Sequence, residues 1–539
     1  MPNFVIFFNK QNIVFLFILS LFLKGLVTMN NDREILINSD HNEAVYNDVQ
    51  NLNSVVGSSW DSNTQPRQLS TITQSIPPIC YPVNNPKPKA LPQFIAAITA
   101  SLAAFASGTV LAWTSSIILV LEDGKYNNIS ITNDEMGWIG SFVTLGAMCT
   151  SFPFGIICDS IGRKAALLIL IVPYSIGWSL IIWADSVLML YFGRFISGMA
   201  AGACCVAAPL YINEIAHKSI RGTLGSYFQL MVTVGILFAY VVGKFATPIL
   251  YTTICSIVPI VFFIVFVFQP ESPFYCLKKG QFDSAYKNLN RLRGADYNVT
   301  DEIMSLRVLE ESQQSNLSIS CSLKRTAGYK AFIIALSLMF FQQLCGINAI
   351  IFYTPDIFTA SGAKIDPQTA TICVGAFQVI ATFISSLMVD KLGRRMLLIS
   401  SEFIMAISTI FLGLFFTLKD RQIIAEDVVS VLGFLPVVSL CVFIIMFSMG
   451  LGPLPWTICG EIFSPELKSF AISSAVTLNW FLAFLVTKFY LKLELLIGSD
   501  VMFYVFSVIC FIGTIFCYTF IPETKGKTIE QIQKELDGC

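Results

Sequence analysis

The sequence predicts an all-α membrane protein of twelve transmembrane helices, arranged as two pseudo-symmetric bundles of six. Three observations predict this fold. Of the 539 residues, 55% are hydrophobic and only 13% are charged, whereas a soluble domain carries about a quarter charged residues. Apolar runs long enough to cross a bilayer recur along the chain. Loop motifs of the first half also return at matching places in the second half.

Twelve apolar runs reach the length of about 20 residues that a bilayer requires. They begin near Phe94, Met136, Ala165, Val187, Thr223, Ala246, Ala331, Thr369, Met396, Val429, Leu467 and Val501. Most of them end at a charge cluster or at a Gly or Pro. We expect a six-helix bundle over 92–270, a cytosolic linker with helices of its own over 271–328, a second six-helix bundle over 329–521 and a short cytosolic tail over 522–539.

The first 91 residues have a different character. Residues 13–23 are apolar but too short to span a bilayer, and they resemble the core of a signal peptide. A cleaved signal would conflict with the orientation given by the loop charges, so a dispensable leader, a true signal and a thirteenth span all stay open. Residues 30–91 are polar and rich in Pro, Asn and Ser, which predicts a disordered cytosolic tail.

Loop charges predict the orientation. Lys and Arg gather after the second and eighth runs and in the long connection between the sixth and seventh, which marks these loops as cytosolic. The loop between the first two runs is acidic and contains a glycosylation sequon at Asn128, which belongs outside the cell. With twelve spans, both bundle termini are then cytosolic in a multi-pass protein.

The composition also excludes several classes of function. A net charge of −1 argues against a nucleic-acid partner. The 15 cysteines lie mostly inside apolar runs, there are only two histidines, and no cysteine pair has zinc-like spacing. We therefore expect no metal and no cofactor. No set of nucleophile and base occurs within the spans, so we expect no enzyme activity. The sequence leaves the oligomeric state open.

A repeat relates the two halves. The loop DSIGRK at 159–164 returns as DKLGRR at 390–395, at the same place within a block of six spans. An acid followed seven residues later by a basic residue also occurs once in each half: Glu214 with Arg221, and Glu461 with Lys468. Repeated halves predict a substrate site near the membrane midplane, where the two bundles meet.

Seven motifs occur in order between residues 92 and 530. They are the loop ending in Gly162-Arg163-Lys164, the stretch from Tyr211 through Glu214 to Arg221-Gly222, PESP at 270–273, QQLCGINAIIFY at 342–353, GPLPW at 452–456, NW at 479–480 and PETKG at 522–526. In this order they resemble the sugar-porter branch of the major facilitator superfamily, most closely the insect facilitated trehalose transporters. The resemblance implies the major facilitator fold, a plasma-membrane location and facilitated sugar transport by alternating access.

Uncharged polar residues inside the spans are candidate sugar contacts. An amide offers two donors and an acceptor with two lone pairs, which suits the hydroxyl groups of a sugar, and an indole offers a flat apolar face. The alternative is hydrogen bonding between helices, worth about 0.6 kcal/mol a pair, and the spacing leaves both readings open. The resemblance favours sugar contacts. The candidates are Gln229, Gln342, Gln343, Asn348, Gln378, Trp456 and Asn479.

Charged residues at the cytosolic helix ends are candidate gate residues. Charges of both signs on two moving halves can pair when this side closes and hydrate when it opens. The alternative is that the basic residues only set the orientation in the membrane, an explanation that does not extend to the glutamates. The resemblance adds Arg194, which lies inside the fourth span. The set is Arg163, Arg194, Glu214, Arg221, Arg394, Glu461 and Lys468.

The first span favours facilitated diffusion over coupling to an ion. Proton-coupled relatives carry a carboxylate in this span, whereas residues 94–121 contain no ionisable side chain. Glu402, in the ninth span, is the possible proton site, and an ion pair with Arg395 is the alternative for it. A proton-coupled porter, a porter of polyols or other small polar solutes, and a non-transporting sugar sensor remain alternative functions.

Two departures from the glucose-transporting relatives bear on the substrate. Ser448 stands where they typically have Glu, and Ala483 where they often have Asn. The C-terminal part of the pocket is therefore expected to be less polar and to accept something other than a single glucose. Trehalose is compatible with such a pocket, but the sequence does not fix the sugar.

Overall fold

The computed structural model describes residues 88–127, 129–217, 219–314, 325–361, 366–421, 432–463, 465–527 and 529–537. The expected leader and nearly all of the expected tail fall outside these residues. The sequon residue Asn128 also falls outside them, so its glycosylation stays a prediction.

The first half of the bundle consists of six spans. The third span is built from α5 and α6, which follow each other at Leu170. Its helices are α3 (Leu91–Glu122), α4 (Asn133–Ile161), α5 (Arg163–Ile169), α6 (Ile171–Ile182), α7 (Val187–Ile215), α8 (Arg221–Phe245) and α9 (Pro248–Phe266). We call this set the N half.

A linker with three short helices precedes the second set of spans, and a last helix follows it. The linker helices are α10 (Pro273–Lys278), α11 (Phe282–Arg293) and α12 (Thr300–Gln314). The C half contains α14 (Thr326–Leu344), α15 (Ile347–Ser361), α16 (Pro367–Leu392), α17 (Arg394–Asp420), α19 (Leu435–Met449), α20 (Leu454–Ile462), α21 (Pro465–Ile497) and α22 (Ser499–Phe520), and α23 (Ile529–Asp537) ends the chain.

Twelve helical stretches in the described residues are long and apolar enough to cross a membrane, which confirms the predicted number. They begin within a few residues of the predicted starts; the largest difference is in the tenth, which begins at Leu435 rather than near Val429. Helices are the expected form because a helix satisfies its own backbone hydrogen bonds, and lipid offers no replacement for them. The described residues contain no strand.

Helices within the N half pack through close contacts at glycines. A Cβ at Gly198 or Gly202 of α7 would lie 2.1 or 2.4 Å from a carbonyl oxygen of α4. A Cβ at Gly108 of α3 or Gly235 of α8 would lie 2.2 Å from a carbonyl oxygen of the facing helix. Only glycine allows these backbones to approach so closely, which is how spans associate when lipid removes the hydrophobic driving force.

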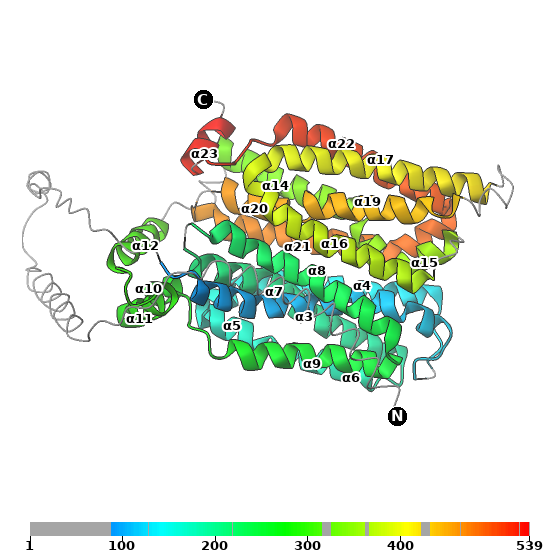
Figure 1. The fold of residues 1–539 in the computed structure, drawn as a ribbon, viewed down its shortest axis with the longest axis horizontal. Helices are drawn as coiled ribbons and strands as arrows, with labels where there is room; N and C mark the ends of the chain where they lie inside the picture. Colours follow the sequence, from blue (N-terminus) through cyan, green and yellow to red (C-terminus); the bar gives the residue numbers. More distant parts are fainter. Residues whose placement is uncertain are drawn as a thin grey trace, which may run out of the picture. The chain divides into compact units, whose positions relative to one another are not determined.

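The bundle has two distinguishable ends (Figure 1). The linker end carries α10, α11 and α12, together with the Gly162 and Gly393 loops. The opposite end carries the connections between α3 and α4 and between α8 and α9. Arg293 of α11 attaches the linker to the N half, because its guanidinium donates to the Ile215 carbonyl at the end of α7.

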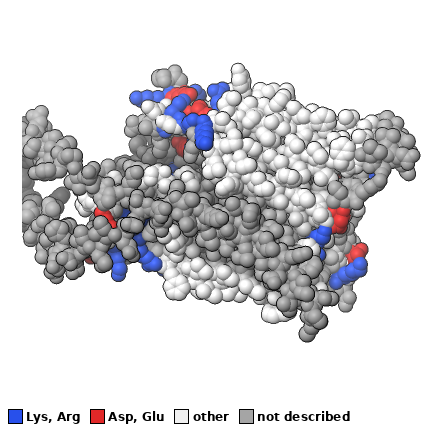
Figure 2. All heavy atoms as spheres, viewed as in Figure 1, with Lys and Arg blue, Asp and Glu red and all other residues white. Residues whose placement is uncertain are grey.

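On one face of the bundle, the described surface between the two ends is uncharged. Figure 2 shows Lys, Arg, Asp and Glu gathered at the ends, while the described part of this face between them carries none. Large hydrophobic side chains are exposed along these spans, among them Ile156, Val172, Ile264, Phe383 and Phe511. Such a belt would be unfavourable in water and is the expected surface of spans that face lipid.

Candidate functional site

The tenth span is interrupted between α19 and α20, in the Gly-Pro-Leu-Pro segment of the GPLPW motif. Pro453 and Pro455 have no backbone N–H, so the carbonyl groups four residues earlier, those of Met449 and Leu451, lose their helical donors. Side chains of other spans replace them. Ser385 Oγ donates to the Met449 oxygen at 2.8 Å, and Gln342 Nε2 donates to the Leu451 and Gly452 oxygens at 2.9 Å.

Gln342 is also the end of a chain of four amides. Asn479 Nδ2 donates to Gln342 Oε1 at 2.6 Å, and Gln343 Nε2 donates to Asn479 Oδ1 at 2.9 Å. Asn348 Nδ2 in turn donates to Gln343 Oε1 at 2.5 Å. The chain joins α14, α15 and α21, and all four residues are buried. Hydrogen bonding between helices, one of the two readings of the sequence, therefore exists in this conformation.

The four amides differ in how much of their hydrogen-bonding capacity this chain uses. Gln342 uses both donors on the two carbonyl oxygens, and Asn479 uses both on Gln342 Oε1 and the Met339 sulfur. Gln343 and Asn348 each use a single donor. Since an amide has two donors and two lone pairs, Gln343 and Asn348 keep spare capacity for a ligand, whereas Gln342 and Asn479 are largely occupied.

Gln229 and Gln378 contribute amides from two further helices, α8 and α16. Within the described residues neither side chain has a hydrogen-bond partner. Gln378 is buried and Gln229 is half-buried. An amide without a protein partner inside a span is costly unless water or a ligand satisfies it. Both residues therefore remain candidates for contact with a polar solute.

A small apolar cluster joins the two halves beside the amide chain. Ala147 of α4 packs against Val476, Trp480 and Ala483 of α21, and the half-buried Trp456 of α20 packs on the same cluster. The predicted contact residue Trp456 thus lies where the halves meet. Its indole ring offers an apolar face at that position, the surface that suits the C–H side of a sugar ring.

Two polar groups in this region were not among the predicted contacts. The Trp480 indole N–H and the Ser448 hydroxyl are buried and have no partner in the described structure. Trp480 follows Asn479 directly, and the NW motif was the signal that could have pointed to it. Ser448 was noted only as a departure from relatives. Orphaned polar atoms are expected where a ligand or water supplies the missing bond.

The predicted gate residues form ion pairs within each half rather than between halves. In the N half, Arg163 Nε and Nη2 lie 3.0 and 2.9 Å from Glu214 Oε1. In the C half, Arg394 Nη2 lies 3.2 Å from Glu461 Oε1. The expected pairing of one half with the other is therefore not what these residues do in this conformation.

Arg221 and Lys468, the remaining gate candidates at the linker end, form no ion pair among the described residues. They belong to different halves, at the starts of α8 and α21. Partial burial and then the charge of Arg221 lower the pKa of Lys468. The carboxylate of Glu461, in the same half as Lys468, acts in the opposite direction.

The assignment of Arg194 to the cytosolic gate was wrong. Arg194 is fully buried in the N half, in the first third of α7 and away from the linker end. Its guanidinium donates to the Val110 carbonyl at 2.6 Å and to Thr114 Oγ1 at 2.7 Å, and it lies 5.2 Å from the centroid of the Trp113 ring. These partners hold α3 against α7, so Arg194 stabilises the interior of one half.

Glu402 does not form the expected ion pair with Arg395. Both of its carboxylate oxygens are buried and have no partner in the described structure, while Arg395 donates to the Tyr518 carbonyl. Glu402 packs against Gly513, so it lies between α17 and α22 and not at the amide chain. An ionised carboxylate without a partner is unfavourable in such surroundings, which favours the neutral acid.

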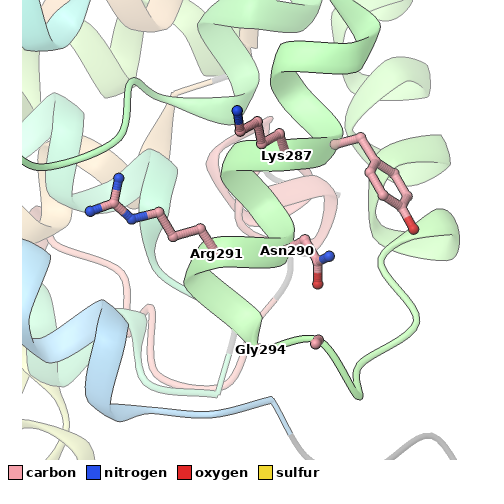
Figure 3. A pocket seen from close by; sticks show the side chains of 6 residues that line it. Lys287, Asn290, Arg291 and Gly294 are labelled. Atoms are coloured by element: carbon pink, nitrogen blue, oxygen red, sulfur yellow. The ribbon is translucent and has the colours of Figure 1, made fainter. Parts of the chain in front are cut away.

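One hollow in the described structure lies on the linker, outside the bundle. It has a volume of about 470 Å³ and is lined by Tyr286, Lys287, Asn290, Arg291, Gly294 and Ala295. Figure 3 shows the side chains of Lys287 and Arg291 on one side of the helix and Asn290 on the other, and Arg291 donates to the Phe268 carbonyl at 2.7 Å. Because these groups do not converge on one point, the hollow is not a candidate substrate site.

Two six-span halves, a broken helix in each of the seventh and tenth spans and uncharged hydrogen-bonding groups between them define a membrane carrier for a polar, uncharged solute. Residues 93–536 match the family model described as "Sugar (and other) transporter". The chain belongs to this family and is therefore a transporter and not an enzyme.

The most similar relatives include two insect proteins. The chain is 35% identical over 448 residues to a protein of Polypedilum vanderplanki named "Facilitated trehalose transporter Tret1", covering 83% of this chain and 88% of that protein. It is 34% identical over 465 residues to a Drosophila simulans protein named "Facilitated trehalose transporter Tret1-2 homolog", covering 85% of this chain and 94% of that one.

Solved structures confirm the major facilitator fold. The xylose transporter XylE, a proton:xylose symporter bound to 6-bromo-6-deoxy-D-glucose, has a TM-score of 0.69 at 23% identity and covers 82% of this chain and 99% of its own. A partially occluded, inward-open conformation of XylE from E. coli has a TM-score of 0.67 at 23% identity, covering 81% of this chain and 99% of its own. At this identity the likeness shows the fold alone.

Proposed function

We propose that this protein is a facilitative transporter of trehalose or a hexose, which it moves across the plasma membrane by alternating access between its two halves. The names of its insect relatives support the substrate class and the facilitated mode. The charge distribution of the loops supports a cytosolic linker end. The observation that carries the proposal is the spare hydrogen-bonding capacity of Gln343 and Asn348 within a buried, uncharged site.

The amide chain suggests how the site works when empty and when loaded. In this structure Gln343 donates to Asn479 and accepts a hydrogen bond from Asn348. An arriving hydroxyl adds to their unused donors and lone pairs or replaces an amide–amide bond. The net gain is small because one hydrogen bond substitutes for another. Millimolar affinity, about −4 kcal/mol, follows from such an exchange and suits a carrier that must release its substrate quickly.

The positions of acidic side chains within the spans favour facilitated diffusion over proton coupling. The first span has no ionisable side chain between residues 94 and 121. Glu402 is the buried acid of the ninth span, and it lies between α17 and α22, away from the amide chain. We expect uptake in proteoliposomes to be equally independent of a pH gradient in the wild type and in Glu402→Gln. A pH-driven uptake that disappears in Glu402→Gln would establish the proton-coupled alternative instead.

Counterflow in sealed vesicles tests the substrate. Vesicles preloaded with unlabelled solute receive labelled trehalose, glucose or a polyol, and we expect saturable exchange of trehalose or glucose. Exchange of the polyol alone would favour the alternative porter. No exchange of any of the three would contradict the proposal and leave the non-transporting sensor.

Two neighbouring glutamines provide a matched test of the site. Gln343→Leu removes an amide with spare capacity, so we expect KM for the sugar to rise about three- to tenfold, the value of one hydrogen bond. It also leaves Asn479 Oδ1 and Asn348 Nδ2 without this partner, so we expect some loss of thermal stability beside the change in KM. Gln342→Leu leaves the Leu451 and Gly452 carbonyl groups without a donor, so we expect its main effect on thermal stability. Equal effects of both variants on KM and stability would contradict the division of roles.

A further inference from the structure

At the opposite end, two Lys–Asp ion pairs join the N half to the C half. Between α4 and α21, Lys488 Nζ lies 3.0 Å from Asp134 Oδ1 and donates to the Asp134 carbonyl at 3.2 Å. Between α8 and α16, Lys244 Nζ lies 2.8 Å from Asp366 Oδ2 and also donates to Thr369 Oγ1. These two helix pairs make the two most extensive contacts between the halves. Each of these contacts therefore contains one ion pair.

The two ion pairs are related by the same pseudo-symmetry as the loop repeat. Asp134 lies in the first turn of α4 and Asp366 is the N-cap of α16, and these helices are the second spans of their halves. Lys244 lies in the last turn of α8 and Lys488 lies in α21, the fifth spans of their halves. Each half therefore supplies one Asp and one Lys, and each contact receives one of each.

The partners of the buried lysine all lie on one facing helix. Lys488 is buried, and its ammonium lies 4.0 Å from the centroid of the Trp138 ring, in addition to its two bonds with Asp134. Asp134 and Trp138 both belong to α4. If α4 moves away from α21, the ammonium loses its carboxylate, its carbonyl and its aromatic ring together. Lys244 is less buried, so its separation from α16 has a smaller effect.

We propose that these two ion pairs form a latch that holds the halves together at the opposite end and that must break before this end opens. The proposal rests on alternating access as proposed above. The hydrogen bond from Lys244 lowers the pKa of Asp366, so this carboxylate stays ionised at neutral pH. At the linker end, by contrast, Arg163–Glu214 and Arg394–Glu461 each lie within one half. The latch thus stabilises the conformation in which the opposite end is closed, and these linker-end pairs do not hold the halves together.

A small cavity beside the second ion pair provides a place to measure opening. It has a volume of about 10 Å³, the size of one water molecule, and lies among Ser115, Tyr240, Lys244 and Thr371. The Ser115 hydroxyl is buried and has no partner in the described structure. Ser115→Cys is nearly isosteric, and its thiol becomes reactive only when the halves separate and water enters.

The experiment measures labelling of Ser115→Cys by a polar maleimide in purified protein in nanodiscs, where both faces are accessible and no sugar is present. The parent without this substitution gives the background of the native cysteines. We expect Lys244→Met to raise the labelling rate about threefold, Lys488→Met about fivefold and the two together about fifteenfold, because each removes one ion pair between the halves and the effects of separate sites multiply. Because no sugar is needed, the outcome does not depend on the transport assays.

A control and a rescue variant keep the test specific. Asp123 and Lys125 form an ion pair at the same end but within a single loop, so Asp123→Asn with Lys125→Met should label at the parent rate. Exchanging the charges, Asp134→Lys with Lys488→Asp, should restore most of the slow labelling. The latch is overturned if the double lysine variant, folded by its melting temperature, labels at the parent rate, or if the exchanged pair labels as fast as Lys488→Met.

Discussion

The N half and the C half contain the same loop motif at the linker end, and the structure builds the first part of it identically. Gly162 and Gly393 both have positive φ, 101° and 87°. After each glycine, a carboxylate from the end of the same half accepts hydrogen bonds from the first backbone N–H groups of the next helix: Glu271 at α5 and Glu523 at α17. Negative charge at a helix N-terminus is favourable, so the repeat is a helix cap in both halves.

The ion pairs next to these caps, Arg163–Glu214 and Arg394–Glu461, differ in how deeply they are buried. Arg163 and Glu214 are 3% and 11% exposed, and Arg163 also pairs with Asp159. Arg394 and Glu461 are 12% and 30% exposed. Ser272 donates to Glu214 in the N half, whereas at the equivalent place in the C half the Thr524 hydroxyl and Glu461 Oε2 have no partner in the described structure.

The difference teaches that a shared motif fixes the cap but not the surroundings of the ion pair. After Glu271 the chain continues directly into α10, whose Tyr275 ring lies 5.2 Å from the Arg163 guanidinium and covers it. After Glu523 the chain turns at Gly526 and α23 packs elsewhere, against α14 and α20. How deeply each Arg–Glu ion pair is buried therefore depends on the segment that follows the motif.

The largest expected effect is that of Arg163→Ala. It leaves the buried Glu214 without its cation, so we expect a loss of about 3–5 kcal/mol in stability and low yields of folded protein. Thermal unfolding in detergent with a fluorescent thiol dye measures the loss. A melting temperature within a degree of the wild type would contradict the buried cluster.

The two glycines sharpen the comparison because they are predicted to behave alike. An alanine Cβ at Gly162 would lie 2.5 Å from Glu271 Oε2, and one at Gly393 would lie 2.6 Å from Glu523 Oε2. Both sites also require positive φ. We expect Gly162→Ala and Gly393→Ala to destabilise the protein equally, by about 1–3 kcal/mol each. Melting temperatures that differ between the two variants would show that the caps are not equivalent.

Arg394→Ala is the matched counterpart of Arg163→Ala and is expected to have a smaller effect. Its partner Glu461 is partly exposed and can hydrate when the guanidinium is lost. We therefore expect a loss of about 0–1 kcal/mol, the value of an exposed pair. The same thermal unfolding assay applies, and a loss as large as that of Arg163→Ala would remove the distinction between the two halves.

The smallest effect concerns pH. Burial acts to raise the pKa of Glu523, but backbone hydrogen bonds from Lys525, Arg394 and Arg395 outweigh it and the pKa is lowered. A carboxylate whose pKa is lower in the folded than in the unfolded protein stabilises the fold at any pH above its unfolded-state pKa, about 4.3 for Glu. This contribution is lost as the pH falls through the pKa of the folded state. We expect flat stability from pH 5 to 8 and a decline below about pH 4.

Glu523→Gln is the control for the pH effect. It removes the titrating group while keeping the shape of the side chain, so its melting temperature should fall less steeply between pH 5 and pH 3 than that of the wild type. If the melting temperatures of both proteins fall equally between pH 5 and pH 3, the decline is caused by other carboxylates and not by the cap at α17.

Much of this architecture was predictable from the sequence because hydropathy, helix length and loop motifs are properties of contiguous residues. The twelve spans and the two halves follow from patterns that can be counted along the chain. A membrane makes this reading more direct than it is for a soluble protein, because lipid enforces helices of nearly fixed length.

The partners of individual polar groups were decided only by the tertiary structure. The sequence did not show that Gln342 serves the broken tenth span while Gln343 and Asn348 keep free capacity. The resemblance grouped Arg194 with the cytosolic gate, and the sequence left open an ion pair between Glu402 and Arg395; the structure shows neither. The rotation of one helix against another decides which side chains meet, and that rotation depends on packing between residues far apart in sequence, which no periodicity within a single helix specifies.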